Sequence, residues 1–358
     1  MADSPYPELK KSHTPAHAGT PWRDHKPPPS VAVWNIIQGF GNYWLLVSAL
    51  DLGVFDAIGM GRSVVVDDLA GDLECSVAHL GRLLDGLVAL GVLDQVRERY
   101  ALNETAERYL LRGSIASMTD LVRVAPGPHD NWVRLAETVR NGRPATPIDD
   151  DPAAFYAPLV RGTFTTQRRA AMLCARAIGV ARLRGEPRML DVGAGGAPWT
   201  ISLLEANPNM TAVVNDFDEV IGIARDKTAE HGVIDRCEFR AGDFRGLPFE
   251  DERYDVVVLG HVCRTEGADG AALLLKRAYA ALREDGRLLL ADYFADNTRK
   301  FNPFSVLMGV TMMASTKHGF TFTNEQFVEW MRDAGFAGIR MIEPIGFNNV
   351  YIARKPRR

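Results

Sequence analysis

The chain has 358 residues, of which 46% are hydrophobic and 24% are charged, and its formal net charge is −4. This balance is typical of a globular protein of two or three domains, and it argues against a nucleic-acid-binding surface or a polybasic membrane anchor. Four scattered cysteines without a CxxC pair, no apolar secretory segment and no uncharged apolar run of about 18 residues predict a cytoplasmic protein that does not cross a membrane.

The N-terminal region changes character near residue 30. Residues 1–30 are rich in proline and poor in aliphatic side chains, which predicts a disordered or strap-like arm. From Val31 onward, apolar residues recur at helical spacing on more than one face, which is typical of a helix buried by a partner subunit. Three glycines (Gly39, Gly41 and Gly53) predict that this helix is broken rather than continuous.

The rest of the segment 31–112 predicts a helical, winged-helix module. A short helix, a second helix over about 76–90 and a small wing, GVLDQVRERYALN, precede a helix capped by Asn103 or Thr105. Winged helices often read DNA, but the second helix here offers only Arg82 as a cation. We therefore expect a dimerisation module and no nucleic-acid partner.

Residues 113–186 are expected to form connecting helices that contribute to an acceptor pocket, with a break at NGRPATPIDDDPAAF. Over residues 187–358 the chain alternates strands and helices. The predicted strands are RMLDVG, TAVVND, CEFRAG, DVVVLGH, GRLLLADY, GIRMIEP and NVYIAR. Because helices separate the first five strands, the pattern predicts an α/β domain with a doubly wound, Rossmann-like sheet of seven strands.

The first of these strands leads into a glycine-rich turn, DVGAGGAPWT, at residues 191–200. Gly193 and Gly195 permit a tight turn and a close approach by a ligand. The third glycine of a dinucleotide fingerprint would fall on Pro198, and no GK[ST] follows, so neither NAD, FAD nor a P-loop nucleotide fits. Asp191, at the end of the strand, would instead accept a hydrogen bond from an ammonium group of the ligand.

Acids also end the next two strands. Asp216 is placed to accept from a ribose diol, and Asp243 from the exocyclic amine of adenine, with Phe244 over the base. In chain order these acids match the methionine, ribose and adenine of S-adenosylmethionine, without a grip on phosphate. We add Phe217 and His261 to the cofactor set; the alternative is that the acids only cap strand ends.

Several of these motifs together resemble a known family. LDVGAGGA, NDFDEV, GDF and HVCRTEG resemble the class I S-adenosylmethionine-dependent methyltransferases, and the helix-wing segment resembles the dimeric small-molecule O-methyltransferases. The resemblance covers residues 31–358 and implies a methyltransferase sheet, a homodimer and a small-molecule acceptor. It departs at Ala197, where the fuller pattern has a third glycine.

The loop after the fourth strand departs further. In the family a His–Asp pair follows this strand and supplies the base, but here Arg264 and Thr265 align with it, and an arginine cannot be a base. Three interpretations stay open. His261 acts as the base or orients the acceptor, with Asp292 beside it; or Arg264 steers an anion or a carbon nucleophile that needs no base; or the protein binds the cofactor without methylating.

Acceptor-binding residues are expected on the stretch FNPFSVLMGVTMMASTKHGF. Phe304, Met308 and Met312 lie near helical spacing there, and methionines suit an irregular apolar pocket, although a core or dimer-facing helix would show the same pattern. Trp132 and Met172 are further candidates.

No metal is expected, because His261, Cys263 and Glu266 follow one another too closely on one loop to converge. The sequence thus predicts methylation of a small, largely apolar, aromatic or polyketide-like metabolite, with oxygen favoured over carbon as the methylated atom.

Overall fold

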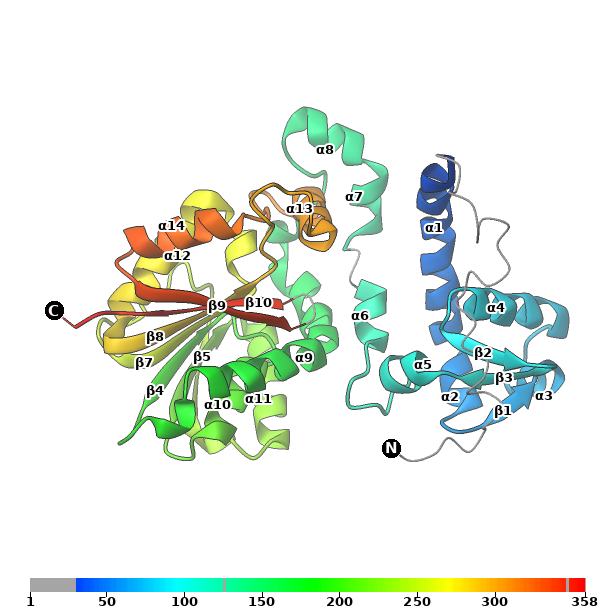
Figure 1. Ribbon diagram of the computed structural model, residues 1–358, viewed down its shortest axis with the longest axis horizontal. Coiled ribbons are helices and arrows are strands. Elements are labelled where there is room, and N and C mark those ends of the chain that lie inside the picture. The colour runs from blue at the N-terminus through cyan, green and yellow to red at the C-terminus, as the bar shows by residue number, and fades with distance from the viewer. Residues whose placement is uncertain (1–29, 125–126, 346–347, 358) are drawn as a thin grey trace. The chain divides into compact units, whose positions relative to one another are not determined.

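The computed structural model (Figure 1) describes residues 30–124, 127–345 and 348–357. The chain forms two compact units, with the boundary between Arg123 and Val124. The predicted N-terminal arm lies outside the described residues, apart from Ser30, which begins the first helix. Each unit is described by itself below.

The first unit has the predicted helix-wing order. Its helices are α1 (Ser30–Asp51), α2 (Val54–Ile58), α3 (Val66–Asp72), α4 (Val77–Ala89), α5 (Glu104–Tyr109) and, at the boundary, α6 (Thr119–Val124); its strands are β1 (Ser63–Val65), β2 (Leu93–Val96) and β3 (Arg99–Leu102). The wing β2–β3 is confirmed, and the unpredicted β1 makes it a three-stranded antiparallel sheet in the order β1-β3-β2. Asn103 caps α5, because its side chain accepts from the backbone N–H of Ala106 at 3.0 Å.

Helix α1 is continuous through two of the glycines predicted to break it. The prediction for Gly39 and Gly41 was wrong, and the chain leaves the helix only near Gly53, whose φ is 74°. An interior glycine costs only about 1 kcal/mol, which a long apolar helix tolerates. Trp34, Ile36 and other apolar residues of α1 are exposed within the chain, 60% and 78% for these two. Even so, none of the described helices is long and apolar enough to cross a bilayer.

The second unit is built on one sheet of seven strands. These are β4 (Arg188–Val192), β5 (Thr211–Asp216), β6 (Cys237–Ala241), β7 (Tyr254–Gly260), β8 (Leu282–Asp292), β9 (Ala337–Ile345) and β10 (Asn348–Arg354), in the order β6-β5-β4-β7-β8-β10-β9. The first five are parallel, and β10 runs antiparallel between β8 and β9. All seven predicted strands and the doubly wound fold class are confirmed.

Helices cover both faces of this sheet (Figure 1). The helices α9 (Pro152–Ala177), α10 (Pro198–Ala206) and α11 (Asp218–Glu230) cover one face, and α12 (Gly267–Ala281) and α14 (Asn324–Asp333) cover the other. The helices α7 (His129–Val133), α8 (Leu135–Asn141) and α13 (Pro303–Ser315) instead contact one another. Neighbouring residues of β5 show the layering, because Val214 packs in one apolar cluster with α9, α10 and α11, and Val213 packs in the other with α12 and α14. The parallel strands therefore bring their carboxyl ends, with the predicted acids, to one edge of the sheet.

Candidate active site

The glycine-rich turn after β4 needs glycine for both its backbone and its packing. Gly193 and Gly195 have φ of 62° and 59°, in the left-handed region. A Cβ on Gly193 would lie 2.5 Å from Cγ1 of Val262, and one on Gly195 would lie 3.1 Å from Cγ1 of Val160. The turn is therefore in close contact with the loop after β7 and with α9.

Ala197 occupies the position where the family pattern has its third glycine. It is the N-cap of α10, has φ of 59° and is completely buried. A left-handed conformation costs a residue with a Cβ about 1–2 kcal/mol. The position therefore favours glycine for a backbone reason, and alanine is accepted at some cost in stability.

Asp191 is completely buried and only partly hydrogen-bonded. Its Oδ2 accepts from the backbone N–H and the hydroxyl of Thr200, at 3.1 and 2.7 Å, whereas its Oδ1 has no hydrogen-bond partner within the described part of the chain. Burial, with a smaller effect from Asp216, raises the pKa of Asp191 to about 7. Sequence reasoning missed Thr200, although it follows the glycine-rich turn directly.

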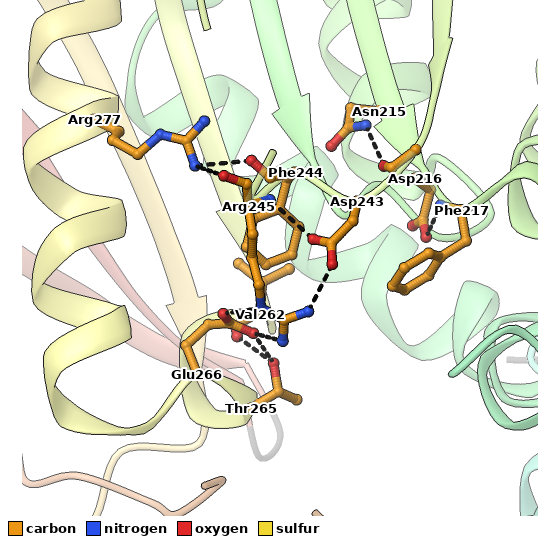
Figure 2. A network of polar contacts seen from close by, with 11 residues as sticks. Asn215, Asp216, Phe217, Asp243, Phe244, Arg245, Val262, Thr265, Glu266 and Arg277 are labelled. Atoms are coloured by element: carbon orange, nitrogen blue, oxygen red, sulfur yellow. Dashed lines mark hydrogen bonds and ion pairs between the residues drawn. The ribbon is translucent and has the colours of Figure 1, made fainter. Parts of the chain in front are cut away.

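Asp216 lies at the end of β5 and is held by backbone amides. Its Oδ2 accepts from Gly195 N–H at 2.7 Å and its Oδ1 from Phe217 N–H at 2.8 Å. Burial raises the pKa of Asp216 to about 6. The neighbouring Asn215 fixes the ends of β5 and β6, since its Nδ2 donates to the carbonyl oxygens of Arg240 and Gly242, both at 2.9 Å. Figure 2 shows one of these two bonds.

Asp243 and Phe244 follow β6 on a loop with its own polar contacts (Figure 2). The two Asp243 oxygens accept from the backbone N–H of Arg245 at 2.9 Å and from its Nη1 at 3.0 Å. Phe244 packs against the cluster of α12 and α14, and its carbonyl accepts from Arg277 at 2.8 Å. Asp243 is thus half-exposed and oriented by a cation, in contrast to Asp191 and Asp216.

The three acids fit S-adenosylmethionine better than a phosphate-bearing nucleotide. Asp191 and Asp216 carry no ion pair to a cation among the described residues, and Asp191 retains an orphaned acceptor. Buried carboxylates of this kind favour ligands that bring positive charge and hydrogen-bond donors, as an ammonium, a sulfonium and ribose hydroxyls do. The glycine-rich turn and these side chains would hold that cofactor.

His261 directly follows β7 in a strained backbone conformation. Its φ is 66°, a region that non-glycine residues rarely adopt and that is enriched at functional sites. The side chain is 4% exposed, its ring centroid lies 4.8 Å from that of Tyr293, and its Nδ1 is 3.8 Å from Oδ1 of Asp292. The predicted neighbours His261 and Asp292 are therefore together, but beyond direct hydrogen-bond distance.

Arg264, rather than His261, is the main partner of the Asp292 carboxylate. Its Nη1 lies 3.0 Å from Oδ1 of Asp292 and donates to the carbonyl of His261 at 2.7 Å, while its backbone N–H donates to Oδ2 at 3.1 Å. The two side chains are 13% and 2% exposed. Arg264 is therefore neither solvent-facing nor paired with the nearby Glu266, which pairs with Arg245 instead.

The acceptor candidates are brought together only in part. Phe304 packs edge-on against Tyr293 at 5.1 Å, Met312 is buried on the same helix α13, and α13 contacts α7, which carries Trp132. Met308 on α13 is half-buried. Met172 lies on α9, is 44% exposed, and joins neither apolar cluster of this unit.

Two tyrosines that the sequence analysis did not single out lie beside these residues. The ring of Tyr293 is next to His261 and Phe304, with the guanidinium carbon of Arg264 at 5.1 Å from its centroid. Tyr156 on α9 lies nearly parallel to Phe217, with ring centroids 6.4 Å apart, and burial raises its pKa to about 12. Tyr293 follows Asp292 at the end of β8, a signal that was available; Tyr156 has no motif around it.

Comparison with known proteins agrees with this geometry. A family model described as "O-methyltransferase domain" matches residues 157–337, and one described as "O-methyltransferase dimerisation domain" matches residues 34–112. The first covers half of the chain, and the second covers the helix-wing module. The dimerisation domain supports a homodimer.

Individual relatives are similar over most of their length. The chain is 26% identical to a 3-hydroxy-5-methyl-1-naphthoate 3-O-methyltransferase of Streptomyces sahachiroi, over 86% of this chain and 90% of that protein. It is 26% identical to the tetracenomycin polyketide synthesis 8-O-methyl transferase of Streptomyces glaucescens, over 87% and 93%. The fold matches human N-acetylserotonin methyltransferase, solved in complex with S-adenosylmethionine, with a TM-score of 0.78 and 21% identity over 93% and 99% of the two chains. The chain therefore belongs to the O-methyltransferase family and is a methyltransferase that uses S-adenosylmethionine.

Proposed function

We propose that this enzyme methylates an oxygen atom of a small, planar, largely apolar metabolite of the aromatic or polyketide type. The observation that carries the proposal is the aromatic cluster at the ends of β7 and β8, in which Tyr293 contacts His261 and Phe304. Among the described residues of this cluster, the charged side chains of Arg264 and Asp292 form an ion pair at 3.0 Å and neutralise each other. An uncharged aromatic acceptor matches such surroundings in shape and polarity.

The acids at the ends of β4, β5 and β6 are the proposed cofactor residues. S-adenosylmethionine supplies a methyl group activated by the sulfonium charge. Asp191 would accept from the ammonium group of its methionine part, Asp216 from the ribose hydroxyls, and Asp243 from the adenine amine. Phe217 and Phe244 would contact the adenosyl part. The turn at Gly193 and Gly195 has no side chains at these two positions, so the cofactor could approach its backbone closely.

His261 is the proposed catalytic group on the acceptor side. It would take the proton of the acceptor hydroxyl as methyl transfer proceeds, a contribution of about 10²–10⁴-fold in rate for general-base catalysis. Asp292 supports it indirectly, because Asp292 fixes Arg264 and the Arg264 guanidinium in turn donates to the backbone carbonyl of His261. Arg264 is thus a positioning residue in this scheme.

The contacts of Arg264 speak against the second interpretation, in which this side chain grips an anionic acceptor. A guanidinium already paired with a buried carboxylate at 3.0 Å has lost most of its attraction for a second anion. Carbon methylation of an enol or an electron-rich ring needs no base and is the alternative outcome that the assay below separates from O-methylation.

Two of the similar proteins support the acceptor class. The relative from Streptomyces sahachiroi is named for a hydroxynaphthoate, and the one from Streptomyces glaucescens for the synthesis of the polyketide tetracenomycin. We further propose that the exposed apolar residues of α1, among them Trp34, Ile36 and Phe40, are covered by a second copy of the chain.

A labelled-methyl screen tests the proposal. The purified enzyme is incubated with methyl-deuterated S-adenosylmethionine and sets of phenols, hydroxynaphthoates and aromatic polyketides, beside aliphatic alcohols and carboxylic acids. We expect a mass gain of one labelled methyl group on phenolic oxygen, located by NMR, and none on the aliphatic set. Methylation of ring carbon alone, or a preference for aliphatic acids, would contradict the proposed acceptor class.

A further inference from the structure

We propose that Arg245 is a positioning residue of the cofactor site. It orients Asp243 for the adenine amine, and it connects the loop of residues 243–247 after β6, here called the adenine loop, to the loop after β7 that carries Arg264. This inference rests on the proposed role of Asp243. Arg245 lies just outside the motif GDF, and Glu266 lies within HVCRTEG, but neither motif predicted that the two side chains pair with each other.

One guanidinium joins two carboxylates on two loops (Figure 2). Nε and Nη2 of Arg245 donate to the two oxygens of Glu266, at 2.8 and 2.7 Å, and Nη1 donates to Asp243 at 3.0 Å. All three guanidinium nitrogens are therefore used. Asp243 follows β6, and Glu266 lies in the loop after β7. Because β5 and β4 lie between β6 and β7 in the sheet, these contacts cross the edge where the adenosyl group is expected.

Burial shows which partner anchors the network. The side chain of Glu266 is 7% exposed, whereas those of Arg245 and Asp243 are 49% and 43% exposed. A buried carboxylate is stable only with a charged or hydrogen-bonding partner. Besides Arg245, Glu266 accepts a hydrogen bond from the hydroxyl of Thr265 at 3.0 Å. Glu266 thus fixes the Arg245 guanidinium, and the guanidinium fixes Asp243.

The backbone of the adenine loop is held from another side, which isolates the role of Arg245. Arg277 on α12 donates to the carbonyl oxygens of Phe244, at 2.8 Å, and of Leu247. Removing the Arg245 side chain leaves these bonds in place. The carboxylate of Asp243 would then lose its orienting cation while its loop keeps its course.

The same contacts link the two halves of the site. Glu266 directly follows the short 3-10 helix η5 (Cys263–Thr265), which contains Arg264. Since the Arg245 side chain bridges this segment to the loop of Asp243, a ligand that contacts Asp243 would also stabilise the position of η5. We therefore expect Arg245 to affect both adenine recognition and, more weakly, the use of the acceptor.

Base selectivity gives a readout that a purely structural role would not move. Adenine offers an amine to Asp243, whereas hypoxanthine presents a carbonyl oxygen that the carboxylate repels. Calorimetry with S-adenosylhomocysteine and S-inosylhomocysteine measures this preference. In Arg245→Met we expect adenosyl affinity to fall about tenfold, the size of one charged hydrogen bond, and the adenosyl-to-inosyl ratio to shrink. Arg283→Met, which removes an exposed ion pair with Asp255, should change neither.

A double variant separates orientation from charge neutralisation. Arg245→Met/Glu266→Gln no longer buries an unpaired carboxylate, so its melting temperature should return toward wild type while adenosyl affinity stays weak. If adenosyl affinity and the base preference also return, Arg245 only neutralises Glu266 and the inference is overturned. Unchanged binding in Arg245→Met has the same meaning.

Arg245→Lys keeps the test open if the methionine variant does not fold, because it retains the charge without the paired hydrogen bonds; its base preference should be reduced as well. Failure of the proposed function would look different. If the wild-type protein had no affinity for S-adenosylhomocysteine, the proposed function and this inference would both be wrong.

Discussion

The ends of β4 and β5 and the ends of β7 and β8 both carry buried acids, but the partners of these acids differ. Asp191 and Asp216 accept hydrogen bonds from backbone amides and from Thr200, with no cation beside them in the described part of the chain. Asp292, on the other side, is paired with Arg264 at 3.0 Å. One sheet edge thus contains an anionic half and an electrically balanced half.

The difference matches the two ligands that a methyltransferase brings together. Buried carboxylates without a cation are costly, as the raised pKa values of Asp191 and Asp216 show, and a positively charged ligand relieves this cost. The balanced half, lined by Tyr293 and Phe304, has no such demand, which agrees with the uncharged aromatic acceptor proposed above. The five predictions below test this division, from the largest expected effect to the smallest.

His261→Ala tests whether the balanced half supplies a base. Loss of the imidazole should lower kcat by about 10²–10⁴-fold, since the acceptor hydroxyl would keep its proton, while affinity for S-adenosylhomocysteine changes little. Steady-state kinetics and calorimetry measure the two quantities. The matched control is His231→Ala, a partly exposed histidine beside Glu205, which should retain full activity. Undiminished turnover in His261→Ala would remove the base from the mechanism.

Asp292→Ala tests the charge balance itself. The variant leaves the Arg264 guanidinium buried without its counter-ion, which should lower the free energy of unfolding by about 3–5 kcal/mol in urea titrations. Adding Arg264→Met should restore most of that loss. Glu137→Ala, in the exposed pair with Arg134, should cost at most about 1 kcal/mol. A single variant as stable as wild type would mean that Arg264 finds another partner.

Asp216→Ala tests the anionic half. Removing the carboxylate should weaken S-adenosylhomocysteine binding about 10–100-fold, because hydrogen bonds to charged groups are worth about 1.5–3 kcal/mol each. Asp218→Asn, an exposed acid two residues further along the chain, serves as the control in the same calorimetric titration. Equal affinities of wild type and Asp216→Ala would assign the acid to the fold alone.

The pH dependence tests the same half without mutation. A carboxyl group whose pKa is raised on folding stabilises the fold below its unfolded pKa, and this stability is lost as the pH rises through the folded pKa, here about 6 for Asp216 and about 7 for Asp191. The ligand-free protein should therefore lose stability as the pH rises from about 4, near the ordinary pKa of an Asp side chain, to about 7. Cofactor affinity should rise over the same range, about tenfold from pH 5 to 7 through Asp216 alone, and Asp216→Asn should remove that part and leave only the part due to Asp191.

Ala197→Gly is expected to have the smallest effect. Glycine relieves the left-handed strain at the start of α10 but adds entropy to the unfolded chain, so the net gain should be about 0.5–1 kcal/mol, seen as a higher melting temperature. Activity should not change. A lower melting temperature would show that the methyl group of Ala197 contributes more through packing than its backbone costs.

The strands and the acids of the anionic half could be predicted from local patterns. Apolar runs flanked by glycine and acids located β4 to β8, and the spacing of Asp191, Asp216 and Asp243 placed these acids at one edge. Local rules failed for α1, where long apolar stretches outweigh two interior glycines, and for β1, which pairs with β3 although two helices and the strand β2 lie between them in the chain. Helix and strand choice in such segments depends on packing partners that the local sequence does not name.

The balanced half was harder to predict because its pairs are distant in sequence. Arg264 and Asp292 were both singled out, yet their mutual ion pair spans 28 positions and has no spacing rule. The same holds for Arg245 and Glu266, which are 21 positions apart. Met172, a further acceptor-binding candidate, is 44% exposed and joins neither apolar cluster of its unit, so its role stays a prediction.

The contact between Gly193 and Val262 restricts how the enzyme can acquire a new acceptor. Any side chain at position 193 would collide with Val262, the residue between His261 and the 3-10 helix η5. A substitution in the glycine-rich turn therefore requires a matching substitution in the loop after β7. Helix α13 is not subject to this restriction. Libraries that aim to broaden the range of methylated compounds should therefore vary Phe304 and Met308 first and leave the 193–262 contact intact.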